Sequence, residues 1–257
     1  MWPFKKRTVP QKAPDVATNT TICIPGLWKD IDEIKNAILS AGKANYMVID
    51  DIFLDVKRER QYNFEIRGHD GRMKKLFEYE GRPTGLKNKV MDEIEQHTHV
   101  IYLTGETGSL VEAEYIAFAA GAILEAGGVG IRIETAGKAF DKKTWVNTIK
   151  KFQEADLYQL FVTDAVSNKN DAVWSCGMHN LGLKDTIVSG EDYQTALDLV
   201  TIFGYYQIID KPAITTGEIF QPDRQSPKYK ISNEPNQPYK DIELFENPYG
   251  MWRLTKI

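Results

Sequence analysis

The order of secondary structure elements expected from the sequence is nearly the same in two successive parts of this chain. Residues 20–104 show the pattern strand, helix, strand, strand, helix, strand, and residues 129–220 repeat nearly this order after one long apolar helix. A βαββαβ order is the ferredoxin-like, split-βαβ motif. The sequence therefore predicts an α/β (α+β) fold of tandem ferredoxin-like units, with mixed or antiparallel sheets and helices packed on one face.

The repeated order divides the 257-residue chain into five expected parts. In chain order they are a flexible N-terminal tail (1–19), a first ferredoxin-like unit (20–109), a central buried helix (110–128), a second ferredoxin-like unit (129–220) and an extended C-terminal tail docked on the body (221–257). Six of the eleven prolines follow residue 211, and proline favours extended backbone over helix interiors. Two such units side by side would leave a cleft between them, which is the natural place for a ligand.

Hydrophobic spacing predicts the elements of the first unit. Thr21–Ile24 is a short apolar strand that ends at Pro25-Gly26. The apolar residues that follow recur at the spacing of one helical face, at Leu27, Ile31, Ile34 and Ile38. Residues 61–67 alternate, with Tyr62, Phe64 and Ile66 on one side, which is typical of a half-buried antiparallel strand. The charged run 57–60 is then a hairpin connection.

The clearest local signal is the start of the central helix. Ser109 is followed three residues later by Glu112, which is a capping box that satisfies backbone N–H groups of the first helical turn. The helix 110–126 behind it is apolar almost all round, so we expect it to be buried on more than one side and to lie between the two halves. In the second unit we expect a strand at 129–134, a helix capped by Asp141, a hairpin of 158–163 with 172–176, and a helix at 191–209.

Composition and charge exclude several classes of function. The chain is 42% hydrophobic and 11% aromatic, as in ordinary globular proteins. A net charge of −4 gives no basic footprint for nucleic acid, and every apolar run is shorter than the ~20 residues that span a bilayer. Two cysteines argue against a disulfide scaffold and fit a reducing compartment, so we expect a cytoplasmic protein with no cofactor.

Histidine and cysteine supply the first set of candidate site residues. His97 and His99 form an H-x-H pair, and Cys176 and His179 form a C-x-x-H pair. Thiolate and imidazole are the usual zinc ligands, so the four residues are a possible metal set if the two segments meet. Cys176 as nucleophile with His179 as base is the other possibility. A buried thiol with ordinary polar histidines explains the same residues without a site.

Three further features have both a functional and a structural interpretation. The turn 104–109 offers backbone N–H groups to an anion, but it lacks the lysine of a P-loop, and the capping box already accounts for Ser109 and Glu112. The acidic residues Asp50, Asp51 and Asp55 can hold Mg²⁺ or solvate a strand edge and deter edge pairing. Trp28, matched by Trp174 in the second unit, is either an interface anchor or a core residue.

Several short strings together resemble a known group. They are Pro25–Trp28, Ala126–Gly128 running into Ile131–Gly137, Gly177–Gly182, and Asn247–Leu254. This set resembles a family of uncharacterised bacterial proteins, a domain of unknown function, some of whose relatives are similar to proteins encoded near polymorphic-toxin and contact-dependent secretion loci. The resemblance covers residues 20–257 and implies a bacterial cytosolic protein, an immunity or secretion-accessory factor. It supplies no catalytic residues.

Two functions follow as expectations. The first is a protein-binding module with a protein partner, which we expect to be basic because the chain is acidic. A homodimer through an edge strand is a further possibility. The alternative is an enzyme or a small-ligand or metal-binding protein that uses the cleft between the halves. Its ligand-binding candidates are Trp28, His99, Glu134, Cys176 and His179.

Overall fold

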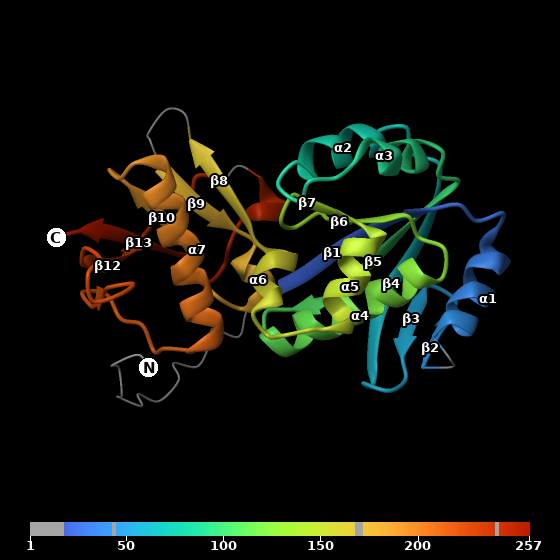
Figure 1. Ribbon diagram of the computed structural model, residues 1–257. Coiled ribbons are helices and arrows are strands. Elements are labelled where there is room, and N and C mark those ends of the chain that lie inside the picture. Colours follow the sequence, from blue (N-terminus) through green and yellow to red (C-terminus); the bar gives the residue numbers. More distant parts are fainter. Residues whose placement is uncertain (1–17, 43–44, 168–171, 240–241) are drawn as a thin grey trace.

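The chain folds around two β-sheets that lie side by side in Figure 1. The structure is a computed structural model that describes residues 18–42, 45–167, 172–239 and 242–257. Seven α-helices and two mostly antiparallel sheets in these ranges confirm the α+β class expected from the sequence. The expected N-terminal tail lies outside the described residues except for Thr18 and Asn19, which begin the first strand.

The first sheet has seven strands in the order β2-β3-β4-β5-β1-β6-β7. All neighbours are antiparallel, and the strands are β1 (Thr18–Gly26), β2 (Tyr46–Ile49), β3 (Ile52–Asp55), β4 (Arg60–Gly68), β5 (His99–Thr107), β6 (Gly130–Ile133) and β7 (Lys138–Asp141). The strands β1 and β5 pair along their whole length, from Thr18 opposite Thr107 to Gly26 opposite His99. This pair is the centre of the sheet.

Helices cover both faces of the first sheet, so the expectation of helices on one face is wrong. One face packs against α1 (Ile31–Ala41), α4 (Leu110–Glu125) and α5 (Lys142–Lys150), and the other against α2 (Met73–Glu80) and α3 (Asn88–Glu95). The strand β1 shows the cause. Ile22 and Ile24 pack into the core on the side of α1, α4 and α5, whereas Cys23 packs into the core on the side of α2 and α3. A central strand that is apolar on both sides needs cover on both sides.

The central helix α4 begins at the predicted cap. The Ser109 hydroxyl accepts a hydrogen bond from the Glu112 backbone N–H at 3.2 Å. The Glu112 carboxylate, however, forms a bidentate pair with the guanidinium of Arg60, at 2.8–3.1 Å. The helix is buried on several sides, as its composition predicts, and contacts α1, α5, α6 (Asp156–Phe161) and the first sheet.

The second sheet has six strands in the order β11-β12-β13-β10-β9-β8. They are β8 (Thr163–Ser167), β9 (Ala172–Cys176), β10 (Asp185–Ser189), β11 (Ile219–Phe220), β12 (Tyr229–Glu234) and β13 (Met251–Lys256). Only the pair of β10 and β13 is parallel among the described strands. The helix α7 (Tyr193–Ile209) covers one face, and the segment that contains Tyr239 and the short 3₁₀ helix η2 (Glu243–Phe245) covers part of the other.

Three segments differ from the sequence expectations in position or type. The strand β6, expected at 129–134 in the second unit, joins the first sheet because Ile22 pairs with Ile133, and β7, which the sequence analysis does not predict, pairs with β6 in the same sheet. Most of residues 158–163, which are expected to form a strand, lie in α6. At the start of α6, the Asp156 carboxylate accepts a hydrogen bond from the Gln153 backbone N–H. The segment after residue 211 supplies three strands of the second sheet, and β13 lies between β10 and β12.

A buried polar cluster joins the two sheets, and we call it the junction. The side-chain oxygen of Asn180, in the 3₁₀ helix η1 (Met178–Leu181), accepts from Thr20 at 2.6 Å and from Thr135 at 2.8 Å. The Asn180 amide donates to the Gly177 carbonyl at 2.8 Å. Asn180 therefore fixes the second half of the chain against β1 and the end of β6. Within the described residues, no helix has both the length and the apolar character needed to cross a membrane.

Candidate functional site

His97 lies in the loop between α3 and β5, where its ring is buried and both of its nitrogens are hydrogen-bonded. The ring donates through Nδ1 to the Ile94 carbonyl at 2.6 Å, and Nε2 accepts from the Asp70 backbone N–H at 2.9 Å. Burial lowers the pKa of His97, so the neutral ring is favoured. His99 lies two residues further along and donates to the Trp28 carbonyl at 3.1 Å. Both histidines tie β5 to neighbouring loops.

Cys176 and His179 lie in the second half of the chain, next to the junction. Burial raises the pKa of the Cys176 thiol, which disfavours the thiolate that a nucleophile or a metal ligand needs. Burial lowers the pKa of His179 to about 4, and its Nδ1 has no hydrogen-bond partner among the described residues. The two side chains share no hydrogen bond, so the structure forms no nucleophile and base from them.

The structure does not bring the two histidine-containing pairs together. His99 is opposite Gly26 at one end of the β1–β5 pair, and the His179 carbonyl accepts from Thr18 at the other end. Eight residues of strand separate these ends, which is about 26 Å at the rise of a β-strand. Within the described ranges, no group of three or more histidine, cysteine or acidic side chains is arranged to hold a metal ion.

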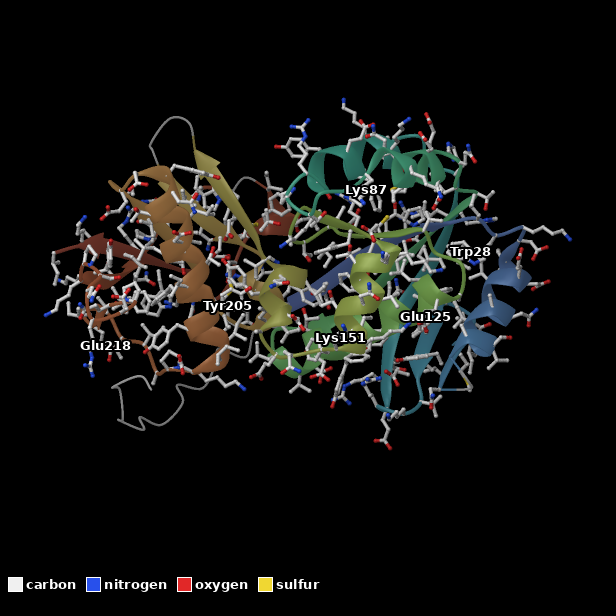
Figure 2. All side chains as sticks on the ribbon, in the orientation of Figure 1. Trp28, Lys87, Glu125, Lys151, Tyr205 and Glu218 are labelled. Carbon is white, nitrogen blue, oxygen red and sulfur yellow. The ribbon has the colours of Figure 1, made fainter. Side chains whose placement is uncertain are left out.

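Trp28 and Glu134 have structural partners in the first half. The Trp28 ring is buried where the chain passes from β1 to α1 (Figure 2), and its Nε1 donates to the Ala126 carbonyl at 2.8 Å. Glu134 pairs with Arg132, whose guanidinium also holds the buried Glu80 at 2.6 and 2.9 Å. Trp28 is therefore a core residue, and Glu134 belongs to an ion-pair cluster of the first sheet.

The turn 104–109 is also structural along most of its length. Residues up to Thr107 are part of β5, so the backbone N–H groups of that part are in a strand rather than in a loop around an anion. Gly108 takes a φ of +87°, and its N–H donates to the Asn180 carbonyl at 3.2 Å. The turn therefore has two structural roles: Gly108 binds Asn180 of the junction, and Ser109 caps α4.

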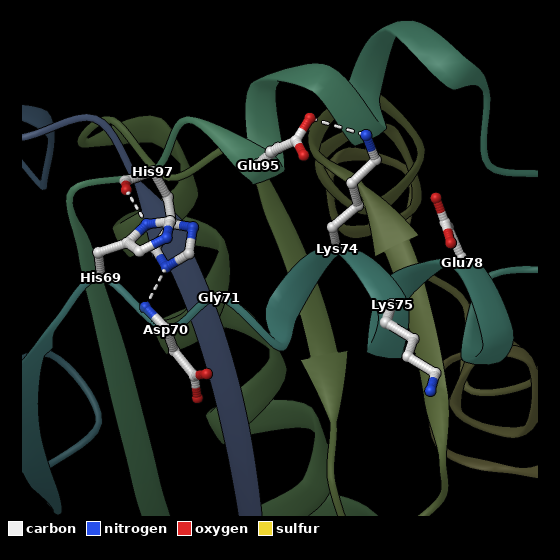
Figure 3. A pocket seen from close by; sticks show the side chains of 8 residues that line it. All are labelled: His69, Asp70, Gly71, Lys74, Lys75, Glu78, Glu95 and His97. Carbon is white, nitrogen blue, oxygen red and sulfur yellow. Dashed lines mark hydrogen bonds and ion pairs between the residues drawn. The ribbon is translucent and has the colours of Figure 1, made fainter.

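A hollow of about 540 Å³ lies beside the start of α2. Figure 3 shows the side chains that line it. The His69 ring stacks on His97 with ring centres 4.4 Å apart, and its Nδ1 donates to the His97 carbonyl at 2.8 Å. Across the hollow, Lys74 pairs with Glu95 at 2.7 Å. Among the lining residues, Lys74 and Glu95 form an ion pair and Asp70 pairs with Arg72 outside the hollow, so these charged groups already have protein partners. The sequence analysis did not single out His69.

The strongest candidate is a part of the first sheet that none of the described helices covers. Strand register places Ile49, Ile52, Asn63, Thr104 and Thr21 in one cross-strand row, because each residue is the direct partner of the next. A second row contains Met47, Leu54 and Gln61. We call the eight side chains of these two rows the open face. The packed side of the same strands faces α4 through Phe53, Tyr62 and Phe64.

The open face is apolar at its rim and polar towards its centre. Ile49 is 51% exposed and Ile52 38% exposed at the outer hairpin, while Gln61 and Asn63 are exposed on β4. The helices α2 and α3 pack on β1, β5 and β7 instead, and they lie at the top of Figure 1 while the β2–β3 hairpin extends to the bottom. Exposed apolar side chains beside polar ones are typical of an interaction surface.

Charge on and beside the open face is acidic. Asp50 and Asp51 form the turn between β2 and β3, and Glu106 lies two residues beyond Thr104 on the same side of β5. No ion pair involves these three carboxylates in the part of the chain that the structure describes. The nearby cations Arg58 and Arg60 point to the α4 side, where they pair with acidic groups and contact the Tyr115 ring. Arg67 lies on the same side of β4 as Asn63, but it is paired with Glu65. We therefore expect this surface to attract cationic groups.

Sequence reasoning found the polar side of β4 and the acidic residues Asp50 and Asp51 at the border of this surface. The alternation of residues 61–67 predicts Gln61 and Asn63 on the polar side of β4, and the structure confirms that side as exposed. The neighbours of β4, which complete the rows, depend on strand pairing that a single sequence does not show. Comparisons with protein-family models, with curated proteins and with solved structures found no match to this chain.

Proposed function

We propose that the protein is a protein-binding module and that the open face is its binding surface. The cross-strand row from Ile49 to Thr21 is the observation that supports this most strongly, because it presents apolar and hydrogen-bonding side chains together on a rigid sheet. The candidate metal-ligating pairs, by contrast, lie at opposite ends of the β1–β5 pair. The candidate nucleophile and base, Cys176 and His179, share no hydrogen bond, and burial shifts the pKa of each in the direction that favours the neutral thiol and imidazole. Binding through a preformed surface needs no such cluster.

The partner is a basic protein in this proposal. Asp50, Asp51 and Glu106 border the open face without a neutralising cation from the described residues, so a partner with lysine or arginine at its contact surface is favoured. Charge of this kind mainly accelerates association and weakens with salt. A bacterial, cytoplasmic role as an immunity or secretion-accessory factor remains a prediction of the sequence resemblance. A fold of tandem ferredoxin-like units remains a prediction as well. The strand order gives this fold no support, because β6 and β7 join the first sheet.

Site-specific photocrosslinking tests the proposal. A photoreactive amino acid replaces Asn63 on the open face, and the matched control replaces Lys151, an exposed residue after α5 that is labelled in Figure 2. Irradiation in the native host should give one defined protein adduct from position 63 and none from position 151. The crosslinked partner should be basic, and the yield should fall as salt rises. Absence of any adduct from position 63, or equal adducts from both positions, would contradict the proposal.

A further inference from the structure

We infer that the partner contributes an extended basic segment that adds to β2 as an eighth strand of the first sheet. This inference rests on the proposed function and specifies how the partner binds. The sheet ends at β2, a strand of four residues whose side chains Met47 and Ile49 form part of the open face. A segment added there would continue that face outward and would extend the apolar rim.

The backbone of β2 has hydrogen-bonding groups that point to its outer edge, where no other described strand pairs with it. The Asn45 carbonyl accepts from the Val56 N–H at 2.8 Å, so Asn45 and every second residue after it direct their backbone groups to β3. By the alternation of an antiparallel pair, Tyr46 and Val48 direct their N–H and C=O groups away from β3. These are the groups that strand addition uses.

The opposite edge of the sheet is closed. On β7, the Ala139 carbonyl accepts from the Thr84 hydroxyl at 2.6 Å. Ala139 and Phe140 are buried, whereas the residues of β2 are at most partly buried, and α1 contacts β2 on the side where Tyr46 and Val48 pack. An added strand therefore finds backbone groups at β2 that are not available in the same way at β7.

The acidic residues at the end of β2 favour a basic segment as the added strand. The turn that ends β2 consists of Asp50 and Asp51, and Asp50 has a φ of +52°, which fixes a tight hairpin tip. A second copy of this chain would bring the same acidic groups to the interface, whereas a lysine-containing segment would neutralise them. We therefore assign the edge to a basic segment of another protein rather than to self-association.

The test uses a defined peptide and two substitutions at one position. The probe is a fluorescent ten-residue peptide that alternates lysine with valine, and its control replaces lysine with glutamate. Val48→Pro removes the outward N–H without removing a bond to β3, and Val48→Thr keeps that N–H. Fluorescence anisotropy at low salt should show binding of the lysine peptide to the wild type and to Val48→Thr. Val48→Pro should bind it at least tenfold more weakly, with unchanged circular dichroism.

Backbone methylation of the peptide separates strand addition from simple charge attraction. One version carries N-methyl groups on all valines, and the other carries them on all lysines. Strand addition uses the N–H groups of only one set, so the affinities of the two versions should differ at least tenfold. Equal affinities, or equal binding to Val48→Pro and Val48→Thr, would overturn the inference.

Two further outcomes separate this inference from the proposed function. If Val48→Pro retains the position-63 crosslink to the partner, a partner binds the open face without adding a strand, and only the inference fails. If position 63 gives no crosslink at all, the proposed function fails as well. Sedimentation velocity of the unliganded protein tests self-association. If the wild type is a dimer and Val48→Pro is a monomer, a second copy of the chain occupies the edge and the inference of a basic partner segment is wrong.

Discussion

The hydroxyl of Tyr239 donates a 2.6 Å hydrogen bond to Oδ2 of Asp185, a carboxylate with no solvent exposure. The same oxygen accepts from the Asn247 amide at 2.7 Å, and the other oxygen accepts from Ser175 and from the Met178 backbone N–H. One buried charge therefore holds the segment before β13 against β9 and β10. The string Asn247–Leu254, which contributed to the family resemblance, has this structural role.

Removing the Tyr239 hydroxyl should destabilise the second sheet. Hydrogen bonds to charged groups contribute about 1.5–3 kcal/mol, so Tyr239→Phe should lower the free energy of unfolding by about that amount. Urea denaturation at pH 8 measures it. Tyr193→Phe, at an exposed position on α7, is the matched control and should change stability by less than about 0.5 kcal/mol. Equal losses in both variants would show that Asp185 does not depend on this donor.

The titration of Asp185 should make stability fall as pH rises through the acidic range. Burial raises the pKa of Asp185 to about 6, above the ordinary 3.8 expected in the unfolded chain. Between these values the native state binds more protons than the unfolded state, so the unfolding free energy decreases with rising pH. Asp185→Asn lacks this titration. Wild type should lose stability relative to Asp185→Asn from about pH 4 to pH 6, and a difference that does not change with pH would contradict the assignment.

His179 should give a pH dependence of the opposite sign. Burial lowers its pKa to about 4, whereas the unfolded value is 6.5, so the unfolded state binds more protons between these values. The stability that the neutral ring contributes is present above pH 6.5 and is lost as pH falls towards 4. Wild type should therefore lose stability relative to His179→Gln over that window. Chemical denaturation of both proteins in pH steps checks the sign.

Removing one partner of the ion pair between Arg132 and Glu80 should strongly lower the free energy of unfolding. Both side chains are nearly buried, at 11% and 9% exposure, so Arg132→Ala leaves a carboxylate without its partner. We expect a loss of about 3–5 kcal/mol in thermal or urea unfolding. Arg72→Ala removes an exposed pair with Asp70 and should cost less than about 1 kcal/mol. The double variant Arg132→Met with Glu80→Leu should recover much of the loss, since the carboxylate that then lacks its partner, Glu134, is more exposed than Glu80.

Two glycines of the first sheet should respond differently to one added methyl group. A Cβ on Gly26 would lie 2.2 Å from the Trp28 ring, and that ring is held by its bond to the Ala126 carbonyl. Gly26→Ala should therefore cost about 1–3 kcal/mol through overpacking. A Cβ on Gly68 meets nothing within 4 Å, so Gly68→Ala should be close to neutral. Differential scanning calorimetry of the two variants makes the comparison.

Local signals in the sequence predict local structure well in this chain. The caps of α4 at Ser109 and of α5 at Asp141 follow from residues within a few positions of one another. The predicted apolar face of α1 is confirmed at Ile34 and Ile38, whereas Leu27 and Ile31, predicted on the same face, are exposed because Leu27 precedes the helix and Ile31 is its first residue. The strand order does not follow, because Ile22 and its partner Ile133 are more than a hundred residues apart in sequence. The short helix α6 was also missed, since six residues are too few for helical periodicity to show.

The candidate site was predictable only in part for the same reason. The polar side of β4 is visible in its own alternation, but the rows of the open face need the register of β2, β3 and β5. The histidine and cysteine pairs, which attract attention in the sequence, turn out to lie at opposite ends of the β1–β5 pair. Residue type alone does not show whether such groups meet.

The central position of β13 has a consequence for biosynthesis. Every strand of the first sheet lies between residues 18 and 141, so that sheet can form while the ribosome is still synthesising the rest of the chain. The second sheet cannot close until residues 251–256 have left the exit tunnel, because β13 separates β12 from β10. The nascent chain should therefore hold β8, β9 and β10 beside an already folded first half, with the junction as the surface on which the last strand completes assembly.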